Sequence, residues 1–234
     1  MHLAEIKKDL HKLASPKKAK ILARFFKTGA GEYGEGDIFL GVTVPRARTV
    51  AQKHKDLSLK DAENLLKSKI HEERLTAILL LVHNYQTGDV RKKKEIVEFY
   101  LKNTARINNW DLVDLSADKI LGAYLLDNKS ERGVLYGLAK SKNIWERRIA
   151  IISTFNLIKN RYFEDTLNIS EILLGDGHDL MHKAVGWMLR EVGKRNLRAE
   201  EGFLKKHVRR MPRTTLRYAI ERFPEDKRLK YLNF

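Results

Sequence analysis

The chain has 234 residues, which is enough for one large domain or two small ones with a buried core. It has no cysteine and no run of 18 apolar residues, which excludes disulfide frameworks, thiolate zinc sites and membrane-spanning segments and leads us to expect a cytoplasmic protein. Lysine and arginine number 46 against 30 acidic residues, and a net charge of +16 is typical of proteins that bind a polyanion such as nucleic acid.

Apolar residues recur at helical spacing along almost the whole chain, beginning with residues 3–13. Ser15-Pro16 is a helix start signal and predicts a second helix that ends near Phe26. Helices can likewise open at Pro45, Pro212 and Pro224. Further helices are predicted over residues 59–67, 72–86, 90–101, 110–126, 131–139, 144–159, 165–174, 179–195 and 200–208. No pair of alternating segments with hairpin chemistry occurs, so the predicted fold class is all-α.

The one long irregular stretch, residues 29–41, contains five glycines. Within it, residues 29–34 match the dinucleotide-binding fingerprint letter for letter, but that motif requires a buried strand before it. Here a basic amphipathic helix precedes it, and Glu32 and Glu35 would repel phosphate. We therefore expect a connector at this place and no nucleotide site.

A loose repeat organises the chain. Arg74, Asp111 and Arg148 are 37 residues apart, and Lys183 follows after a further 35. Each lies at the start of an apolar helix that follows a shorter amphipathic one. Two helices per period of this length are typical of an α-α superhelix of HEAT-like repeats, whose second helices line a concave face. We expect one domain over residues 1–234 with a basic, concave DNA-binding groove.

The basic residues cluster. Residues 181–213 contain ten basic side chains against three acidic ones, among them Lys183, Arg190 and Lys194. A surface that is basic without a functional reason is the alternative interpretation. The clustering favours a nucleic-acid partner, because neutralising phosphates releases condensed counterions.

Trp110 and Asp114 are one turn apart and share a helix face. Asn109 before them is a good N-cap, and Asp111 is favoured in the first turn by the helix dipole. Asp114 lies beyond that turn, so capping does not explain it. Taken singly, a tryptophan is usually a core residue and an aspartate a solvated one. Their pairing at a repeat position makes them candidates for a cleft.

Two further constellations share this character. Lys183, Trp187 and Arg190 are spaced by four and three residues and so lie on one helix face. Trp145 lies one turn before Arg148. An arginine in such a place is usually a salt-bridge partner, which is the alternative to a role at a groove.

Four segments carry a resemblance. Residues 109–114 read Asn-Trp-Asp-Leu-Val-Asp, and residues 143–148 read Asn-Ile-Trp-Glu-Arg-Arg. Residues 183–191 read Lys-Ala-Val-Gly-Trp-Met-Leu-Arg-Glu, and residues 39–46 read Phe-Leu-Gly-Val-Thr-Val-Pro-Arg. In this order, and over most of the chain, they resemble segments of the AlkD family of DNA alkylation repair glycosylases.

The resemblance implies a domain of HEAT-like repeats on duplex DNA and hydrolysis of the N-glycosidic bond of purines alkylated at N3 or N7. It implies that Trp110, Asp114 and Trp187 form the catalytic cleft. The basic side chains that we expect to contact DNA are Arg148, Arg190, Lys183, Lys194 and Arg46. Where some relatives have aromatic residues, this chain has Asp179 and Leu180, and Phe25 replaces a tyrosine of some members.

The residue types suit that reaction. Cleavage builds oxocarbenium character on the sugar, which a fixed carboxylate such as Asp114 stabilises while it orients a water molecule. An alkylated, cationic base leaves without being protonated, so neither a second acid nor a metal or cofactor is required. No lysine is expected at the cleft to form a Schiff base, which predicts a monofunctional enzyme.

A metal site and two other functions are the alternatives to a glycosylase. His178 and His182 are one turn apart but lack a third ligand at helical spacing, so no metal site is expected. A non-catalytic binder of distorted or branched DNA on the same scaffold is the first rival function. An RNA- or protein-binding HEAT-like adaptor is the second. The Trp110, Asp114 and Trp187 set favours a monomeric glycosylase that acts on double-stranded DNA.

Overall fold

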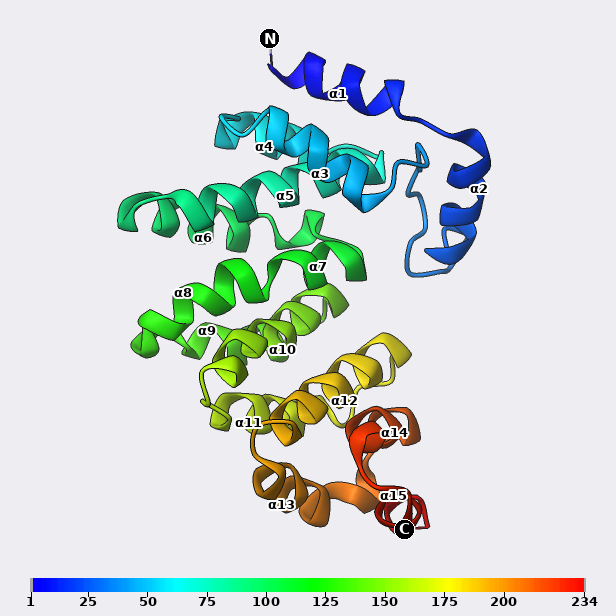
Figure 1. The fold of residues 1–234 in the computed structure, drawn as a ribbon, viewed down its shortest axis with the longest axis vertical. Coiled ribbons are helices and arrows are strands. Elements are labelled where there is room, and N and C mark those ends of the chain that lie inside the picture. The colour runs from blue at the N-terminus through cyan, green and yellow to red at the C-terminus, as the bar shows by residue number, and fades with distance from the viewer. Residues whose placement is uncertain (1, 234) are drawn as a thin grey trace. The chain divides into compact units, whose positions relative to one another are not determined.

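The computed structural model describes residues 2–233 of the chain, and within that range the regular structure is helical (Figure 1). A parallel bridge joins Ile38 to Ile70 outside the helices. The chain folds as two compact units, Met1–Ser116 and Ala117–Phe234. The all-α fold class predicted from the hydrophobic periodicity is confirmed, while the single domain over residues 1–234 and the concave groove stay predictions.

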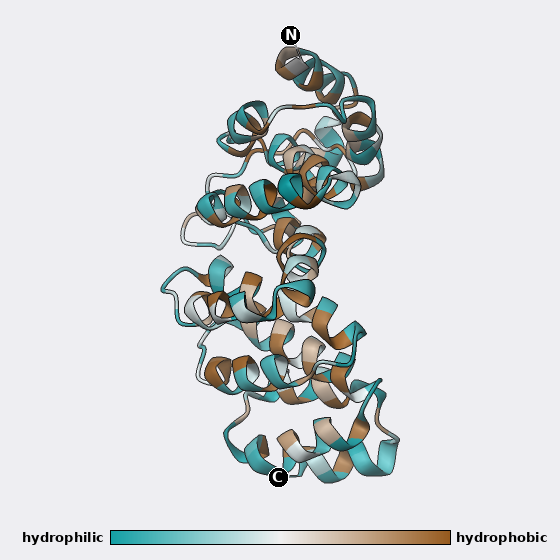
Figure 2. Ribbon diagram, turned by 90° about the vertical axis from the view of Figure 1, so that its left-hand side faces the viewer, coloured by the Kyte–Doolittle hydropathy of each residue, from teal (hydrophilic) through white to brown (hydrophobic). Residues whose placement is uncertain are grey.

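The first unit is built around one buried helix, α5, which packs against α3, α4, α6 and α7. Leu75–Val82 of α5 are buried without interruption, so the helix has no solvent-facing side over two turns. On the helix next to the N-terminus in Figure 2, α1, hydrophobic and hydrophilic residues both occur. The helices of this unit are α1 (His2–Lys12), α2 (Pro16–Phe25), α3 (Val44–Lys53), α4 (Leu59–Leu66), α5 (His71–Thr87), α6 (Val90–Lys102) and α7 (Trp110–Ser116).

Side chains before the helices set where they begin. The Ser15 hydroxyl accepts a hydrogen bond from the Lys18 amide at the start of α2, and Pro16 occupies the first helical position. Asp89 does the same for the Lys92 amide at the start of α6. The helix starts predicted at Ser15-Pro16 and near Pro45 are therefore confirmed.

In the second unit α10 takes the central place, with α9, α11 and α12 against it. Asn143 caps its start by accepting a hydrogen bond from the Trp145 amide at 2.9 Å. Pro212 and Pro224 directly precede two short C-terminal helices, as predicted. The helices of this unit are α8 (Ala123–Asp127), α9 (Gly133–Ala139), α10 (Ile144–Lys159), α11 (Glu164–Leu173), α12 (Asp179–Gly193), α13 (Leu197–His207), α14 (Arg213–Ala219) and α15 (Glu225–Leu232).

The helix predicted over residues 110–126 is present, but it is not a regular α-helix throughout, because a π-helical turn over Asp118–Gly122 lies between α7 and α8. Two side chains of α10 compensate the carbonyls at this turn. Ser153 donates to the Ala117 carbonyl, and the Asn156 amide group donates to the Asp118 carbonyl. A Cβ at Gly122 would overlap the backbone of α10, so the residue type there permits this close packing.

Glu200 of α13 is a buried carboxyl group in the second unit, with 1 % of its surface exposed. It packs against Gly193, where a Cβ would overlap its carboxylate, and its Oε1 has no hydrogen-bond partner among the described residues. Burial raises the pKa of Glu200 to about 8, although the charges of Lys227 and Arg190 act in the opposite direction. The folded protein therefore keeps this carboxyl group protonated at neutral pH.

We predict that Glu200→Gln stabilises the protein at pH 8. Between pH 4.5 and 8 the unfolded chain has lost a proton that the folded chain retains, so the free energy of unfolding falls by about 1.4 kcal/mol per pH unit from this group. Glutamine has no such proton, so at pH 8 the variant should gain on the order of a few kcal/mol in urea unfolding and nothing at pH 4.5. Glu98→Gln, which changes an exposed glutamate of α6, serves as control, and equal gains at both pH values would contradict the prediction.

Candidate functional site

A pocket of about 390 Å³ opens in the first unit among α2, the segment that follows it, the start of α3, α5 and α7. This volume falls in the range of about 300–1,000 Å³ that is typical of small-molecule sites. Its walls are mostly apolar, and its polar lining residues are carboxylates, one hydroxyl and one imidazole. The lining residues are Leu22, Phe25, Phe26, Phe39, Val42, Thr43, Val44, His71, Glu72, Leu75, Trp110, Asp111, Asp114 and Leu115.

Aromatic rings stack through one side of this pocket. The ring of Phe26 lies parallel to Trp110, with centroids 5.1 Å apart and planes 14° apart. The Phe26 ring also stacks on the ring of Phe39, with centroids 5.0 Å apart. The Phe39 ring stacks in turn on the imidazole of His71, with centroids 4.6 Å apart. Phe25 approaches Trp110 edge-on at 5.9 Å and keeps 61 % of its surface exposed. The indole is therefore held by its neighbours and still lines the pocket.

Trp110 and Asp114 both line the pocket from α7, as their one-turn spacing predicted. Asn109 fixes the start of this helix, because its side-chain oxygen accepts the Trp110 amide at 2.8 Å. Both Trp110 and Asp114 are half-buried. An indole and a carboxylate thus lie on one rigid helix at an apolar pocket.

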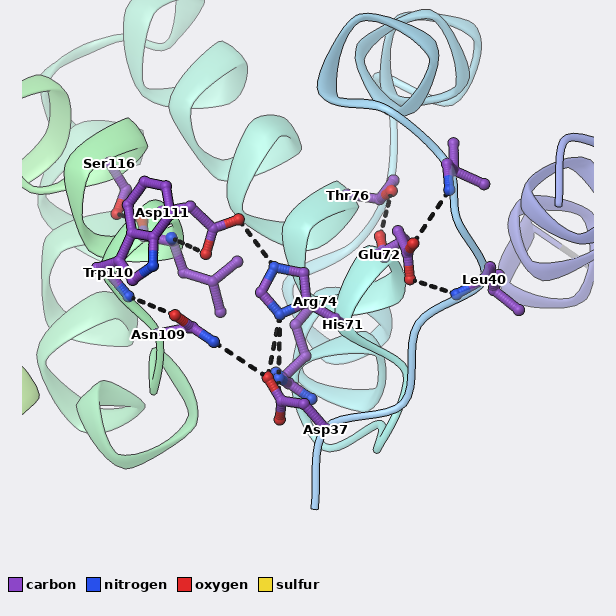
Figure 3. A network of polar contacts seen from close by, with 12 residues as sticks. Asp37, Leu40, His71, Glu72, Arg74, Thr76, Asn109, Trp110, Asp111 and Ser116 are labelled. Atoms are coloured by element: carbon purple, nitrogen blue, oxygen red, sulfur yellow. Dashed lines mark hydrogen bonds and ion pairs between the residues drawn. The ribbon is translucent and has the colours of Figure 1, made fainter. Parts of the chain in front are cut away.

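His71 joins three segments of the chain behind these residues (Figure 3). Its Nε2 is 2.8 Å from Asp111 Oδ2, and its Nδ1 is 3.1 Å from Asp37 Oδ2. Asp37 also accepts from Arg74 Nη2 at 2.6 Å and from the Asn109 amide group at 3.3 Å. These side chains come from the connector after α2, from α5 and from the start of α7, so the network ties the three together.

Burial alone would lower the pKa of His71, but the hydrogen bond and charge of Asp111, together with the bond to Asp37, raise it above its ordinary value. Burial likewise raises the pKa of Asp37, and the contacts of this carboxylate with His71 and Arg74 outweigh that effect and hold its pKa below the usual range. The two carboxylates and the two cations of this network balance in charge.

Glu72 stabilises the connector through its backbone. Its two carboxylate oxygens accept the amides of Leu40, Gly41 and Val42 at 2.9, 2.8 and 3.1 Å. Gly41 has a φ of 84°, and a Cβ there would overlap the backbone near Ser15, so glycine is required at this turn. Glu72 therefore presents no free oxygen to the pocket that it lines.

All but one of the other predicted site residues lie in the second unit. Trp187 of α12 is half-buried and lies 5.9 Å from the ring of Phe155. Lys183 pairs with Asp179 at 2.7 Å, which neutralises the acid noted at this place in the sequence. Lys194 pairs with Glu191 at 2.6 Å, and Arg190 pairs with Glu221. In the first unit, Arg46 is exposed in the first turn of α3.

Arg148 departs most from the environment expected of a DNA contact. Only 5 % of its surface is exposed, and its Nη1 donates to the Leu180 carbonyl at 2.7 Å. A guanidinium at this place supports the first turn of α12, because that carbonyl belongs to the second residue of the helix. Its contact with DNA stays a prediction.

The sequence model of the family described as "DNA alkylation repair enzyme" matches residues 6–223. The chain belongs to this family. A solved structure described as "Predicted DNA alkylation repair enzyme from Enterococcus faecalis" is similar over 91 % of this chain and 97 % of that chain, with a TM-score of 0.72 and 18 % sequence identity. No curated protein matches the sequence.

These findings confirm the predicted resemblance to the AlkD-like family and the predicted α-α superhelical repeat fold. As a DNA alkylation repair family member, the protein has a role in the repair of alkylated DNA, and DNA is its implied partner. Within residues 2–233, no group of three or more His, Asp or Glu side chains is placed to hold a metal ion. None of the described helices is both long and apolar enough to cross a bilayer.

Reasoning from the sequence missed His71 and Glu72, which line the pocket from the start of α5, and Asp37, which contacts His71 from the connector after α2. One signal was present in the sequence. The α5 helix opens with the charged run 71–74, and all four of these residues are buried. Consecutive charged residues at the start of an otherwise apolar helix indicate that they have partners elsewhere in the fold.

Proposed function

We propose that this protein is a monofunctional DNA glycosylase that hydrolyses the N-glycosidic bond of cationic N3- or N7-alkylated purines in duplex DNA. The observation that carries the proposal is the pairing of Trp110 and Asp114 on one helix at an apolar, aromatic pocket. The membership of the family of DNA alkylation repair enzymes supports it. Trp187 is proposed as the third residue of the catalytic cleft.

In the proposed reaction a water oxygen bonds to C1′ of the sugar while the bond from C1′ to the base nitrogen breaks. The electron pair of that bond leaves with the base and neutralises its positive charge. The Asp114 carboxylate stabilises the oxocarbenium character of the sugar and orients or deprotonates the water. The faces of Trp110 and its aromatic neighbours attract the cationic centre, by about 1 kcal/mol or more once desolvated.

The product is an abasic site. None of the described residues that line the pocket is a lysine, so no amine is available there to form a Schiff base with the sugar. The DNA backbone is proposed to be contacted by five basic side chains, those of Lys183, Lys194, Arg46, Arg190 and Arg148. The monomeric state and the cytoplasmic location stay predictions.

Single-turnover release of N7-methylguanine from a duplex with one lesion tests the proposal. We expect base release above the spontaneous rate measured without enzyme, and strand breakage only after alkali treatment. A duplex without the lesion should bind with an affinity that falls steeply with salt, at a log–log slope of about −0.9 per phosphate contacted. Salt-sensitive binding without release would favour the non-catalytic binder of distorted or branched DNA. The absence of both would favour the RNA- or protein-binding adaptor.

A further inference from the structure

His71 lies between two carboxylates that can each only accept a hydrogen bond in their ionised form. Two ionised carboxylates at its two ring nitrogens favour a proton on each of them, that is, an imidazolium, and only 2 % of the surface of His71 is exposed. A neutral imidazole has one N–H, so its other nitrogen would turn a lone pair toward Asp37 or Asp111. Because the site is buried, a lone pair that faces a carboxylate oxygen there is unfavourable, even though Asp37 and Asp111 have other partners.

The two carboxylates lead directly to the start of α7. Asp111 Oδ1 accepts the Leu112 amide at 2.9 Å, and Asp37 receives the Asn109 amide group, whose oxygen accepts the Trp110 amide. Figure 3 shows the contacts that lead from His71 through Asp37 and Asn109 to Trp110 and, at the other ring nitrogen, the contact with Asp111. The first turn of α7 is thus held through side chains that meet at His71.

We infer that the imidazolium of His71 is a positioning residue that holds the start of α7, and with it Trp110 and Asp114, in the geometry needed for base excision. The effect on excision rests on the proposed function. His71 does not itself donate a proton to the base, because both of its N–H groups are bonded to carboxylates. The inference concerns its charge and not a transferred proton.

The charges around His71 decide when it titrates. Asp37 faces it from the connector and Asp111 from α7, while Arg74 lies 3.5 Å from its Nδ1 on the same helix. Glu72, the next residue, directs its carboxylate to the backbone of residues 40–42. The two aspartates favour the charged ring and Arg74 opposes it, with the aspartates prevailing.

The test follows His71, Trp110 and excision over pH 6 to 9.5 in the full-length protein. Side-chain ¹⁵N resonances report the protonation of His71, assigned by their absence in His71→Asn, and the indole N–H of Trp110 is assigned by Trp110→Phe. We expect the Trp110 resonance and the excision rate to change with the pKa of His71, the rate falling about tenfold per pH unit above it. Asp111→Asn removes one opposite charge and should move all three curves to lower pH.

His54→Asn is the matched control, because His54 is also buried and its Nε2 contacts Asp9 at 3.0 Å away from the pocket. It should leave the three curves where they are. If no lesion is excised but Trp110 still titrates with His71, the proposed function fails and the positioning role stands. The inference would be overturned if His71 were neutral at pH 7. It would also be overturned if neither the Trp110 resonance nor the excision rate changed as His71 titrates.

A different observation carries a second inference. The second unit has a pocket of about 950 Å³ among α13, the 3₁₀ turn Val208–Arg210 and α15. Five of its nine lining residues are lysine or arginine, and one is acidic. Lys206 pairs with Glu171 and Lys227 with Glu201. Within residues 2–233, the other three cations, Lys205, Arg209 and Lys230, form no ion pair.

We propose that this pocket binds phosphate groups of a nucleic-acid backbone. Three uncompensated cations around one opening form a local positive potential, which matches closely spaced phosphates. The pocket belongs to the second unit, whereas the Trp110–Asp114 pocket belongs to the first. The inference rests on the proposed DNA partner and not on catalysis.

The experiment compares binding of an undamaged duplex by the wild type and two triple variants over a salt series. Lys205→Ala/Arg209→Ala/Lys230→Ala should shallow the log–log slope by about 0.9 per lost contact, close to 3 in total. Lys55→Ala/Lys60→Ala/Lys69→Ala, which removes three exposed lysines elsewhere, should change it by less than 1. Titration with inorganic phosphate at constant ionic strength is the second arm.

An unchanged slope in the pocket variant overturns the inference, even where the wild type binds and excises. Loss of phosphate binding with an unchanged slope would assign the pocket to a free anion. A shallower slope in a protein that excises no base would leave this inference intact and contradict the glycosylase proposal. A wild type that binds no DNA contradicts both.

Discussion

Asp114→Asn is expected to slow excision of N7-methylguanine by roughly 100-fold or more while DNA affinity stays equal or rises slightly. The substitution keeps the shape of the side chain on α7 and removes the charge that meets the oxocarbenium ion. Preorganised charge of this kind is worth about 10²–10³ in rate when a single group is removed. The measurement is single-turnover base release at saturating enzyme, with affinity measured separately on an undamaged duplex.

Asp127→Asn is the control for this prediction, because Asp127 is an exposed aspartate at the end of α8. It should leave the rate unchanged. Trp110→Ala and Trp187→Ala should also slow excision, and their unfolding curves must be measured, since both indoles pack against phenylalanine rings. An Asp114→Asn variant that excises at the wild-type rate would eliminate Asp114 as the catalytic carboxylate.

The parts of this site that could be predicted are those fixed by local geometry. Trp110 and Asp114 share a face because they are four residues apart in a helix, and Asn109 caps that helix because of its residue type. The repeat at 37 residues predicted the helices on which Arg74, Asp111 and Arg148 lie, and these residues do lie in the first two turns of α5, α7 and α10. Sequence spacing suffices where the contact is within one helix.

The rest depends on packing between segments that are far apart in the chain. His71 meets Asp37 and Asp111 across 34 and 40 residues, and no local pattern specifies which of many carboxylates a buried histidine will contact. The π turn before α8 has the same origin, because its carbonyls are satisfied by Ser153 and Asn156 of α10. The helical pattern of residues 110–126 alone does not indicate that Ser153 and Asn156 contact them.

Packing between helices also determines the environment of Arg148. Its repeat position predicts a groove residue, and the alternative was a salt-bridge partner. The hydrogen bond of its Nη1 is neither of these, because the guanidinium donates to the backbone carbonyl of Leu180, which a periodicity in sequence does not reveal. Charge at a repeat position therefore predicts a location in the fold better than it predicts exposure.

Lesion charge should decide which bases are excised. We expect measurable release of N7-methylguanine and N3-methyladenine, and no release above background of uracil, hypoxanthine or 1,N6-ethenoadenine. The first two are cationic and leave without being protonated, whereas a neutral base requires a general acid or an oxyanion-type donor set. The His71 and Glu72 side chains do not supply such a donor to the pocket. Both N–H groups of His71 are bonded to carboxylates, and the Glu72 carboxylate accepts three backbone amides.

The measurement is parallel single-turnover excision on matched duplexes that carry one lesion each, with the spontaneous rate of each subtracted. His71→Asn sharpens it, because this variant removes the one imidazole at the pocket. If His71 were a hidden general acid, the variant would lose activity on neutral bases selectively. In the proposed mechanism the wild type does not excise neutral bases, so His71→Asn changes nothing there. The variant should excise cationic bases more slowly, because the start of α7 is no longer held in place. Comparable rates on uracil and N7-methylguanine in the wild type would exclude a mechanism with a single carboxylate, even in a protein that proved to be a glycosylase.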